Sequence, residues 1–235
     1  MDDSTPRVLE IPALQGTPGL VHGFGLRLRP GLVEPRDESL RRSATALAAR
    51  GRLLLLRQVH GATVRRAPWE DQPEGDAAIA HCPGHLLGIR TADCLPVLIA
   101  DPRRRLVGAA HAGWRGTAKG VVRRLVAALL EESSRSRDLI AALGPAIGPC
   151  CYEVGEEVRA ALGAGAAPAF RPGPRGRPHL DLRAANRLQL LEAGLRADNV
   201  HAIEECTACR PDRYHSHRRD GSAAGRMISY IGFIR

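Results

Sequence analysis

The chain has 235 residues, 44% of them hydrophobic, and a formal net charge of +9. This length is enough to bury one large core, and the hydrophobic content excludes a mainly disordered chain. No apolar run approaches the roughly 18 residues of a membrane-spanning helix, and the acidic start Met1–Ser4 has no signal-peptide pattern. We therefore expect one cytoplasmic domain over residues 1–235, a monomer or small homo-oligomer with no membrane partner.

Arginine carries almost all of the positive charge, because Lys119 is the only lysine among 34 basic residues. Phosphate contacts use lysine as readily as arginine, and an aromatic content of 3% leaves little for base stacking. We therefore expect no nucleic-acid partner. The six cysteines include the adjacent pair Cys150 and Cys151, which suits no ordinary disulfide framework. Metal or nucleophile chemistry is the more informative interpretation of cysteines near histidines.

The chain alternates between strand and helix patterns after an uninformative start, in which residues 1–20 are expected to be flexible. Apolar runs predict strands over 52–59, 85–91, 95–100, 106–110 and 139–143, with closing strands over 200–204 and 226–234. Helical periodicity covers 121–130, 153–162 and 182–193, the last with Asp181 as N-cap. The segment 163–178, rich in Gly, Pro and Arg, predicts a surface loop. The pattern is that of one mixed α/β domain.

Three polar side chains follow or end β-rich runs: His60, Cys94 and His111. Sites in α/β folds are commonly built at strand ends, so these residues can converge. Two histidines and a cysteine bind zinc and leave a fourth position open for water. The same residues could act as a Cys–His nucleophile pair without metal, or be an ordinary hydrogen-bonded set with a small core cysteine.

Two further motifs carry possible chemistry. Cys206 and Cys209, followed by His215 and His217, match the ligand types of a structural zinc site, although the gap between the pairs is short. Whether these four bind a second metal stays open, since strand alternation also explains the histidines. Arg115, within Gly113–Gly116 at the start of a helix, could bind an anion such as phosphate.

Five ordered motifs resemble the laccase-domain family, long described as polyphenol oxidoreductases, which includes purine nucleoside phosphorylases and peptidoglycan editing factors. They are Gln58–Gly61, Thr91–Val97, Ala110–Gly116, Gly144–Gly155, and a C-terminal set of Cys206–Thr207, Arg218–Gly221 and Gly225–Met227. The resemblance implies a single-domain four-layer α-β-β-α sandwich like that of deamidating toxins. It implies one zinc ion per chain on His60, Cys94 and His111. Cys209 departs from the family's usual pattern.

The resemblance implies phosphorolysis of adenosine, inosine, guanosine and methylthioadenosine, with adenosine deaminase activity. Deamination needs an acid that moves a proton, and Asp93 is the nearest candidate in sequence. Phosphate needs cationic partners, for which we expect Arg115 and Arg57. The alternatives are a Cys94-dependent amidase that edits peptidoglycan precursors by removing a wrong amino acid from a UDP-muramyl intermediate, and a non-catalytic nucleotide-binding module.

Copper oxidation is not expected, despite the family's older description. The chain has nine histidines with one His-x-His pair, too few for the several copper sites of a true multicopper laccase. A blue-copper site would also want an axial methionine, and only Met1 and Met227 exist.

Overall fold

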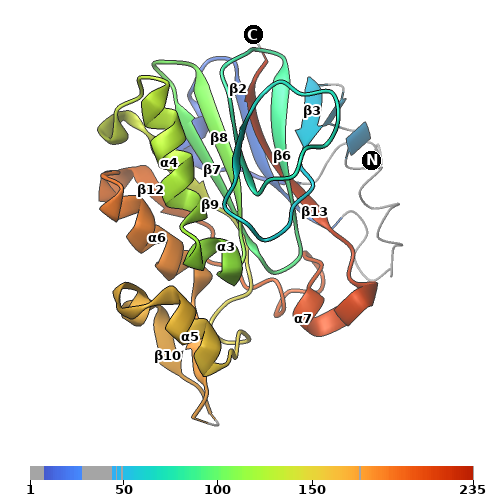
Figure 1. The fold of residues 1–235 in the computed structure, drawn as a ribbon. Helices are drawn as coiled ribbons and strands as arrows, with labels where there is room; N and C mark the ends of the chain where they lie inside the picture. The colour runs from blue at the N-terminus through green and yellow to red at the C-terminus, as the bar shows by residue number, and fades with distance from the viewer. Residues whose placement is uncertain (1–7, 28–43, 46, 49, 175, 235) are drawn as a thin grey trace.

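Two β-sheets pack face to face in the computed structural model, which describes residues 8–27, 44–45, 47–48, 50–174 and 176–234 (Figure 1). The five-stranded sheet has the order β1 (Val8–Leu9), β2 (Leu20–Gly25), β13 (Met227–Phe233), β6 (His85–Thr91) and β3 (Arg52–Leu55). The six-stranded sheet has the order β12 (Val200–Ala202), β9 (Ile140–Leu143), β7 (Leu95–Asp101), β8 (Leu106–Ala112), β5 (Ala77–Ala80) and β4 (Val64–Arg66). Both sheets are mixed, because β3–β6, β4–β5 and β9–β12 pair in parallel.

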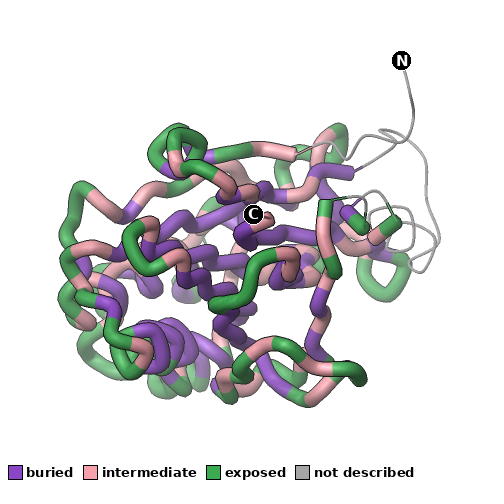
Figure 2. Tube along the Cα trace, turned by 90° about the horizontal axis from the view of Figure 1, so that it is seen from above, coloured by how far each residue is buried: buried purple, intermediate pink, exposed green. Residues whose placement is uncertain are grey.

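The strand β7 shows why the middle strands are apolar throughout. Successive side chains of a strand point to opposite faces. Leu98 packs in the core between the sheets, whereas Val97 and Ile99 pack in the core beneath the helices. Every residue of β6, β7 and β8 except His85 and Arg90 is buried. Figure 2 shows that the buried parts of the chain lie in the middle of the molecule. A strand covered on both faces has no reason to alternate polar and apolar residues.

Helices cover the outer face of the six-stranded sheet (Figure 1). They are α3 (Trp114–Ala118), α4 (Val121–Glu131) and α6 (Leu182–Glu192). The predicted stripe of α4 is buried from Val121 to Leu129, but its last member, Leu130, is 38% exposed. The predicted cap of α6 is confirmed, since the Asp181 carboxylate accepts hydrogen bonds from the backbone N–H groups of Arg183 and Ala184.

Two segments for which the sequence suggested a loop or a flexible start contain regular elements. The segment 163–178 is not irregular, because it holds a 3-10 helix (Ala164–Ala169) and β10 (Phe170–Pro172), which pairs with β11 (Pro178–Leu180). Residues 8–20 are also ordered: β1 pairs with β2, and α1 (Pro12–Gln15) buries Leu14 completely. Residues 1–7 lie outside the described part. Strand pairing and side-chain burial, rather than composition, determine the structure of segments 163–178 and 8–20.

The remaining elements are short. They are α5 (Glu156–Leu162), α7 (His217–Asp220) and three 3-10 turns, Ser136–Asp138, Ala197–Asn199 and Gly221–Ala223. On the outer face of the five-stranded sheet, Ala44 and Leu47 pack against Leu86 and Tyr230. The expected α+β class is therefore confirmed, with helix, sheet and sheet layers in the described residues. No helix within those residues has the length and apolar character needed to cross a membrane.

Candidate active site

Three side chains from different parts of the fold meet at one edge of the six-stranded sheet. One ligand atom each of His60, Cys94 and His111 lies within 4.8 Å of the other two. His60 is in the loop between β3 and β4, Cys94 directly precedes β7, and His111 is in β8. The structure thus brings together the three residues that the sequence placed at or next to the ends of apolar runs.

Strand register and a glycine explain this convergence. In the β7–β8 pair Leu95 lies opposite Ala112, which places the preceding Cys94 beside Gly113. A Cβ atom at Gly113 would lie 2.8 Å from Cys94 Sγ and 3.3 Å from His60 Cδ2. Because non-bonded heavy atoms prefer separations of about 3.5 Å or more, only glycine leaves room for the two side chains.

Asp76 connects two of these residues and was missed by the sequence analysis. It directly precedes β5, which pairs with β8, and its Oδ1 lies 2.8 Å from His111 Nδ1. Its carboxylate also accepts hydrogen bonds from the backbone N–H groups of His60, Val59 and Gly61 at 2.6 to 3.1 Å. Burial alone would raise the pKa of Asp76, but His111 and these backbone groups lower it. The carboxylate therefore orients His111 and fixes the His60 loop.

The electrostatics of the trio favour a thiolate. Burial opposes ionisation of Cys94, yet the facing His111 and His60 more than offset it and lower the pKa of the thiol to about 6. His111 uses Nδ1 toward Asp76, which leaves Nε2 for another partner. A histidine whose second nitrogen bonds a carboxylate is the usual arrangement of a metal ligand. Two imidazoles and one thiolate fit zinc with an open position.

A cavity of about 810 Å³ opens beside the three side chains. Such a volume suits a small organic ligand. The cavity is also lined by Asp93, Arg115, Gln58, Arg90, Thr91, Ala92, Trp114, Ile147, Tyr152, Leu182, His217, Arg218 and Arg226. Most of these residues lie within the sequence motifs quoted above, but apart from Asp93, Arg115 and His217 none was given a role from the sequence.

The two arginines expected to bind phosphate lie in different places. Arg115 lines the cavity, its guanidinium stacks 4.3 Å from the Trp114 ring, and within the described ranges it forms no ion pair. Arg57 pairs with Glu74 at 2.7 Å, and it is not among the residues that line the cavity. Of these two arginines, Arg115 is therefore the one placed to meet an anion in the cavity.

Asp93 lines the cavity, but its carboxylate already holds the C-terminal segment. Oδ1 accepts a hydrogen bond from Thr207 Oγ1 at 2.5 Å, and Oδ2 accepts from Ser216 Oγ at 3.1 Å and from the Arg218 backbone N–H at 2.6 Å. Asp93 also has a left-handed backbone, with φ 84°. These contacts fit a residue that positions the cavity wall better than one that moves a proton.

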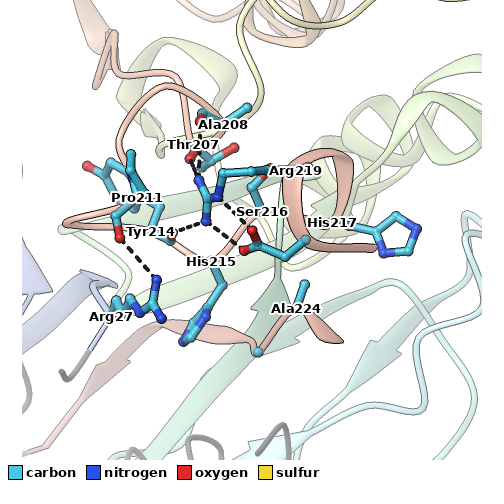
Figure 3. Close-up of polar contacts among 12 residues, drawn as sticks. Arg27, Thr207, Ala208, Pro211, Tyr214, His215, Ser216, His217, Arg219 and Ala224 are labelled. Carbon is cyan, nitrogen blue, oxygen red and sulfur yellow. Dashed lines mark hydrogen bonds and ion pairs between the residues drawn. The ribbon is translucent and has the colours of Figure 1, made fainter. Parts of the chain in front are cut away.

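Cys206, Cys209, His215 and His217, which the sequence left open as a second metal site, do not assemble. Figure 3 shows His215 pointing toward Arg27 and His217 pointing away from it. His215 is buried, and His217 is exposed with Nδ1 2.9 Å from the Gly221 carbonyl. The two cysteines instead meet Cys150 and Cys151, with all four sulfur atoms within 4.8 Å of one another. Local spacing therefore grouped the two cysteines with histidines that lie elsewhere in the fold.

A family model described as "Multi-copper polyphenol oxidoreductase laccase" matches residues 33–234. The chain belongs to this family. A relative named purine nucleoside phosphorylase, from Deinococcus radiodurans, is 39% identical over 214 residues, which cover 90% of this chain and 83% of the relative. One named adenosine deaminase RL5, from an unknown prokaryotic organism, is 34% identical over 160 residues, covering 66% of this chain and 61% of the relative.

A solved structure of the laccase-like family has the same fold. The crystal structure of YlmD from Geobacillus stearothermophilus superposes with a TM-score of 0.86 at 30% identity, covering 98% of this chain and all of that one. The expectation of membership in the laccase-domain family is thus confirmed. The relatives' names describe nucleoside-processing enzymes, which agrees with a cavity of small-molecule size beside three side chains that could hold a metal ion.

Proposed function

We propose that this chain is a zinc-dependent purine nucleoside phosphorylase that also deaminates adenosine. The observation that carries the proposal is the trio His60, Cys94 and His111, backed by Asp76, at the edge of the 810 Å³ cavity. The names of the family relatives support nucleosides as the substrate class.

His60, Cys94 and His111 would hold the metal. When bound, zinc supplies a Lewis acid that lowers the pKa of a water at its open position toward neutrality. Copper fits less well, because the trio has no methionine beside it in the cavity lining, and a multicopper centre needs more imidazoles than the described groups offer. Asp76 keeps Nδ1 of His111 engaged, so that Nε2 is presented to the site.

Phosphorolysis requires an anion held beside the sugar while positive charge develops at C1′. Arg115 is the side chain we assign to phosphate, since its guanidinium borders the cavity and is not neutralised by a carboxylate among the described residues. A guanidinium binds phosphate oxygens through two parallel hydrogen bonds, which also orients the nucleophile. The proposal does not assign phosphate binding to Arg57, because its ion pair with Glu74 lies outside the cavity lining.

Base and ribose would occupy the rest of the cavity. Trp114 and Tyr152 offer aromatic surfaces, and Gln58 offers an amide. The Gln58 amide is partly committed, because it exchanges two hydrogen bonds of 2.9 Å with the backbone of Arg90. Asp93 keeps the role of a positioning residue, since three donors already occupy its carboxylate.

The test is product analysis after incubation of purified protein with adenosine, with and without phosphate. The proposal expects adenine and ribose 1-phosphate only when phosphate is present, and inosine in both samples. Adenine at equal rates without phosphate would indicate hydrolysis and contradict phosphorolysis. No product in either sample, from protein with zinc bound to the trio, would contradict the proposal as a whole.

One observation favours a second candidate, a Cys94-dependent amidase that edits UDP-muramyl peptidoglycan precursors. Cys94, His111 and Asp76 form the series nucleophile, base and orienting carboxylate that thiol hydrolases use. In that case metal-free protein would hydrolyse an aminoacylated muramyl substrate, and iodoacetamide would modify Cys94 and stop it. If chelation abolishes every activity, the amidase candidate fails.

A further inference from the structure

We propose that Cys150, Cys151, Cys206 and Cys209 form a second, structural zinc site, separate from the cavity trio. All four sulfur atoms lie within 4.8 Å of one another. Cys209 Sγ is 3.6 Å from Cys150 Sγ and 3.4 Å from Cys151 Sγ. Zinc–sulfur bonds of about 2.3 Å in a tetrahedron put the sulfurs about 3.8 Å apart. The cluster is thus already near the size that one zinc ion requires.

The backbone around the cluster brings two distant loops together. Ala146 and Cys206 form a parallel bridge, and the Thr207 N–H donates to the Ala146 carbonyl at 3.1 Å. Gly148 stands where the loops are closest, since a Cβ atom there would lie 3.2 Å from Cys206 Cβ and 3.3 Å from Cys150 Sγ. The site therefore rests on loop contacts that exist independently of the sulfur atoms.

A backbone donor already points at one of the sulfurs. The Gly148 N–H lies 3.2 Å from Cys206 Sγ. Backbone N–H groups of this kind surround metal-bound thiolates, because they stabilise the negative charge on sulfur and orient it. An isolated buried thiol, which behaves as a small hydrophobe, has no need of such a donor.

The surroundings argue against ordinary core cysteines. Cys150 and Cys209 are exposed, and Cys151 and Cys206 are half-buried against the core beneath the helices, so the cluster lies at the surface of that core and not inside it. Cys82, also exposed, belongs to neither metal-ligating group found among the described residues. Four thiols within 4.8 Å of one another offer four sulfur ligands, the number that a tetrahedral zinc site needs. An iron–sulfur cluster would need more widely separated sulfurs to enclose its inorganic core.

The site joins the two loops that support the cavity wall. Arg218 extends from the C-terminal segment and donates hydrogen bonds to the carbonyls of Cys151 and Glu153. Between them lies Tyr152, which lines the cavity and whose ring is 5.3 Å from the Arg218 guanidinium. A metal at the cluster would fix the 150–153 turn to the segment that begins at Cys206. The function of this second metal site is therefore to hold Tyr152 in place.

The test is a metal count on full-length protein purified anaerobically with reductant and supplied with zinc only. Plasma mass spectrometry should find two zinc ions per chain. The double substitution Cys206→Ser and Cys209→Ser should leave one, and Cys82→Ser, the matched exposed control, should leave two. After cobalt replacement, sulfur-to-cobalt charge-transfer absorption should fall to a minor fraction in the double variant, because four of the five thiolate ligands are lost with the cluster.

Several results would overturn the site. An equal zinc content in the wild type and the double variant would do so. So would a wild-type mass lower by two hydrogen atoms, with a Cys150–Cys209 or Cys151–Cys209 disulfide in place of the metal. If the double variant does not fold, thiol titration of the wild type decides: the cluster thiols should react only after a strong chelator is added, and immediate reaction would contradict the site.

The count also separates this site from the proposed function. Cys94→Ser should remove only the zinc at the trio. A wild type with only one zinc ion, kept in Cys94→Ser and lost in the double variant, would support the cluster while contradicting zinc at the trio. The reverse result would contradict the cluster and leave the proposed function intact.

Discussion

Asp76 Oδ1 lies 2.8 Å from His111 Nδ1, and the same oxygen accepts the His60 backbone N–H at 2.9 Å. One buried carboxylate therefore fixes two members of the trio, one through its ring and the other through its main chain. His60 needs this support, because its φ of 58° is unusual for a residue with a side chain. The geometry of the site depends on a residue that is itself no part of the trio.

Substitution Asp76→Asn should weaken zinc binding about 10- to 100-fold, the usual effect of losing a carboxylate behind a ligating histidine. The amide keeps the shape but cannot accept all the donors around it. The measurement is a competitive zinc titration with a chromogenic chelator. Asp101→Asn is the matched control: this buried carboxylate also accepts backbone and hydroxyl donors, but it lies at the far end of β7, roughly 20 Å from Cys94. Equal zinc affinity in wild type and Asp76→Asn would contradict the role of Asp76 in supporting the ligating histidine.

Substitution Gly113→Ala should abolish zinc binding at the trio, because its methyl group would lie 2.8 Å from Cys94 Sγ. The displaced sulfur could no longer meet both histidines. Metal content and phosphate-dependent adenine release should fall together by at least about tenfold, in line with a misplacement of about 1 Å. Gly16→Ala serves as the control, since its Cβ would meet nothing within 4 Å. A Gly113→Ala protein with full zinc and full activity would rule out this close packing.

Substitution Arg115→Gln should raise the KM for phosphate about 10- to 100-fold while leaving adenosine deamination within about twofold of wild type, since only phosphorolysis uses the anion. Initial rates of adenine and inosine formation from the same samples provide the comparison. Arg57→Gln should change neither rate, because Arg57 pairs with Glu74 away from the cavity lining. Loss of both activities in Arg115→Gln, or a phosphate effect in Arg57→Gln, would reverse this assignment.

His215 should make the free energy of unfolding depend on pH. Burial first, and then Arg27, Arg219 and Arg226, lower its pKa to about 4, although Asp220 acts in the opposite sense. The unfolded chain therefore binds the proton more readily than the folded protein does. The contribution of neutral His215 to the free energy of unfolding is complete above pH 6.5 and is lost as the pH falls from 6.5 toward 4. The loss amounts to up to about 3 kcal/mol at about 1.4 kcal/mol for each pKa unit.

Urea unfolding of wild type and His215→Gln at several pH values measures this effect. The difference between the two proteins should shrink or reverse in favour of the variant as the pH falls from 7 to 4. His217→Gln is the control, since His217 is exposed on α7. A constant difference between wild type and His215→Gln over this range would show that His215 is not the titrating group.

The long central strands and the three residues of the trio could be predicted because their signals are local, whereas β1, β2, β4 and β5 were not predicted. Long apolar runs set β6, β7 and β8 to within one or two residues of the predicted bounds, since a strand buried on both faces needs such a run. The trio followed from polar residues at or beside the ends of those runs. Asp76 gave only a weak signal, a single acid before the short apolar run Ala77–Ala80, and nothing local linked it to His111.

The cysteine cluster shows where local spacing fails. Cys206 and Cys209 were grouped with His215 and His217 because these lie nearby in sequence. The structure pairs them with Cys150 and Cys151, more than fifty residues earlier, through the bridge between Ala146 and Cys206. Composition likewise did not reveal that 163–178, a segment rich in Gly and Pro, contains a strand that pairs with β11. Contacts between distant loops decide only the cysteine cluster.

The most direct test of the account measures zinc content and phosphate-dependent adenine release on the same preparations of wild type, Cys94→Ala and His111→Ala. The account predicts that both substitutions remove the zinc bound by the trio and lower adenine release by at least about a thousandfold, while any zinc at the cysteine cluster remains. Undiminished phosphorolysis in Cys94→Ala protein that has lost this zinc would contradict the central claim that His60, Cys94 and His111 carry the reaction.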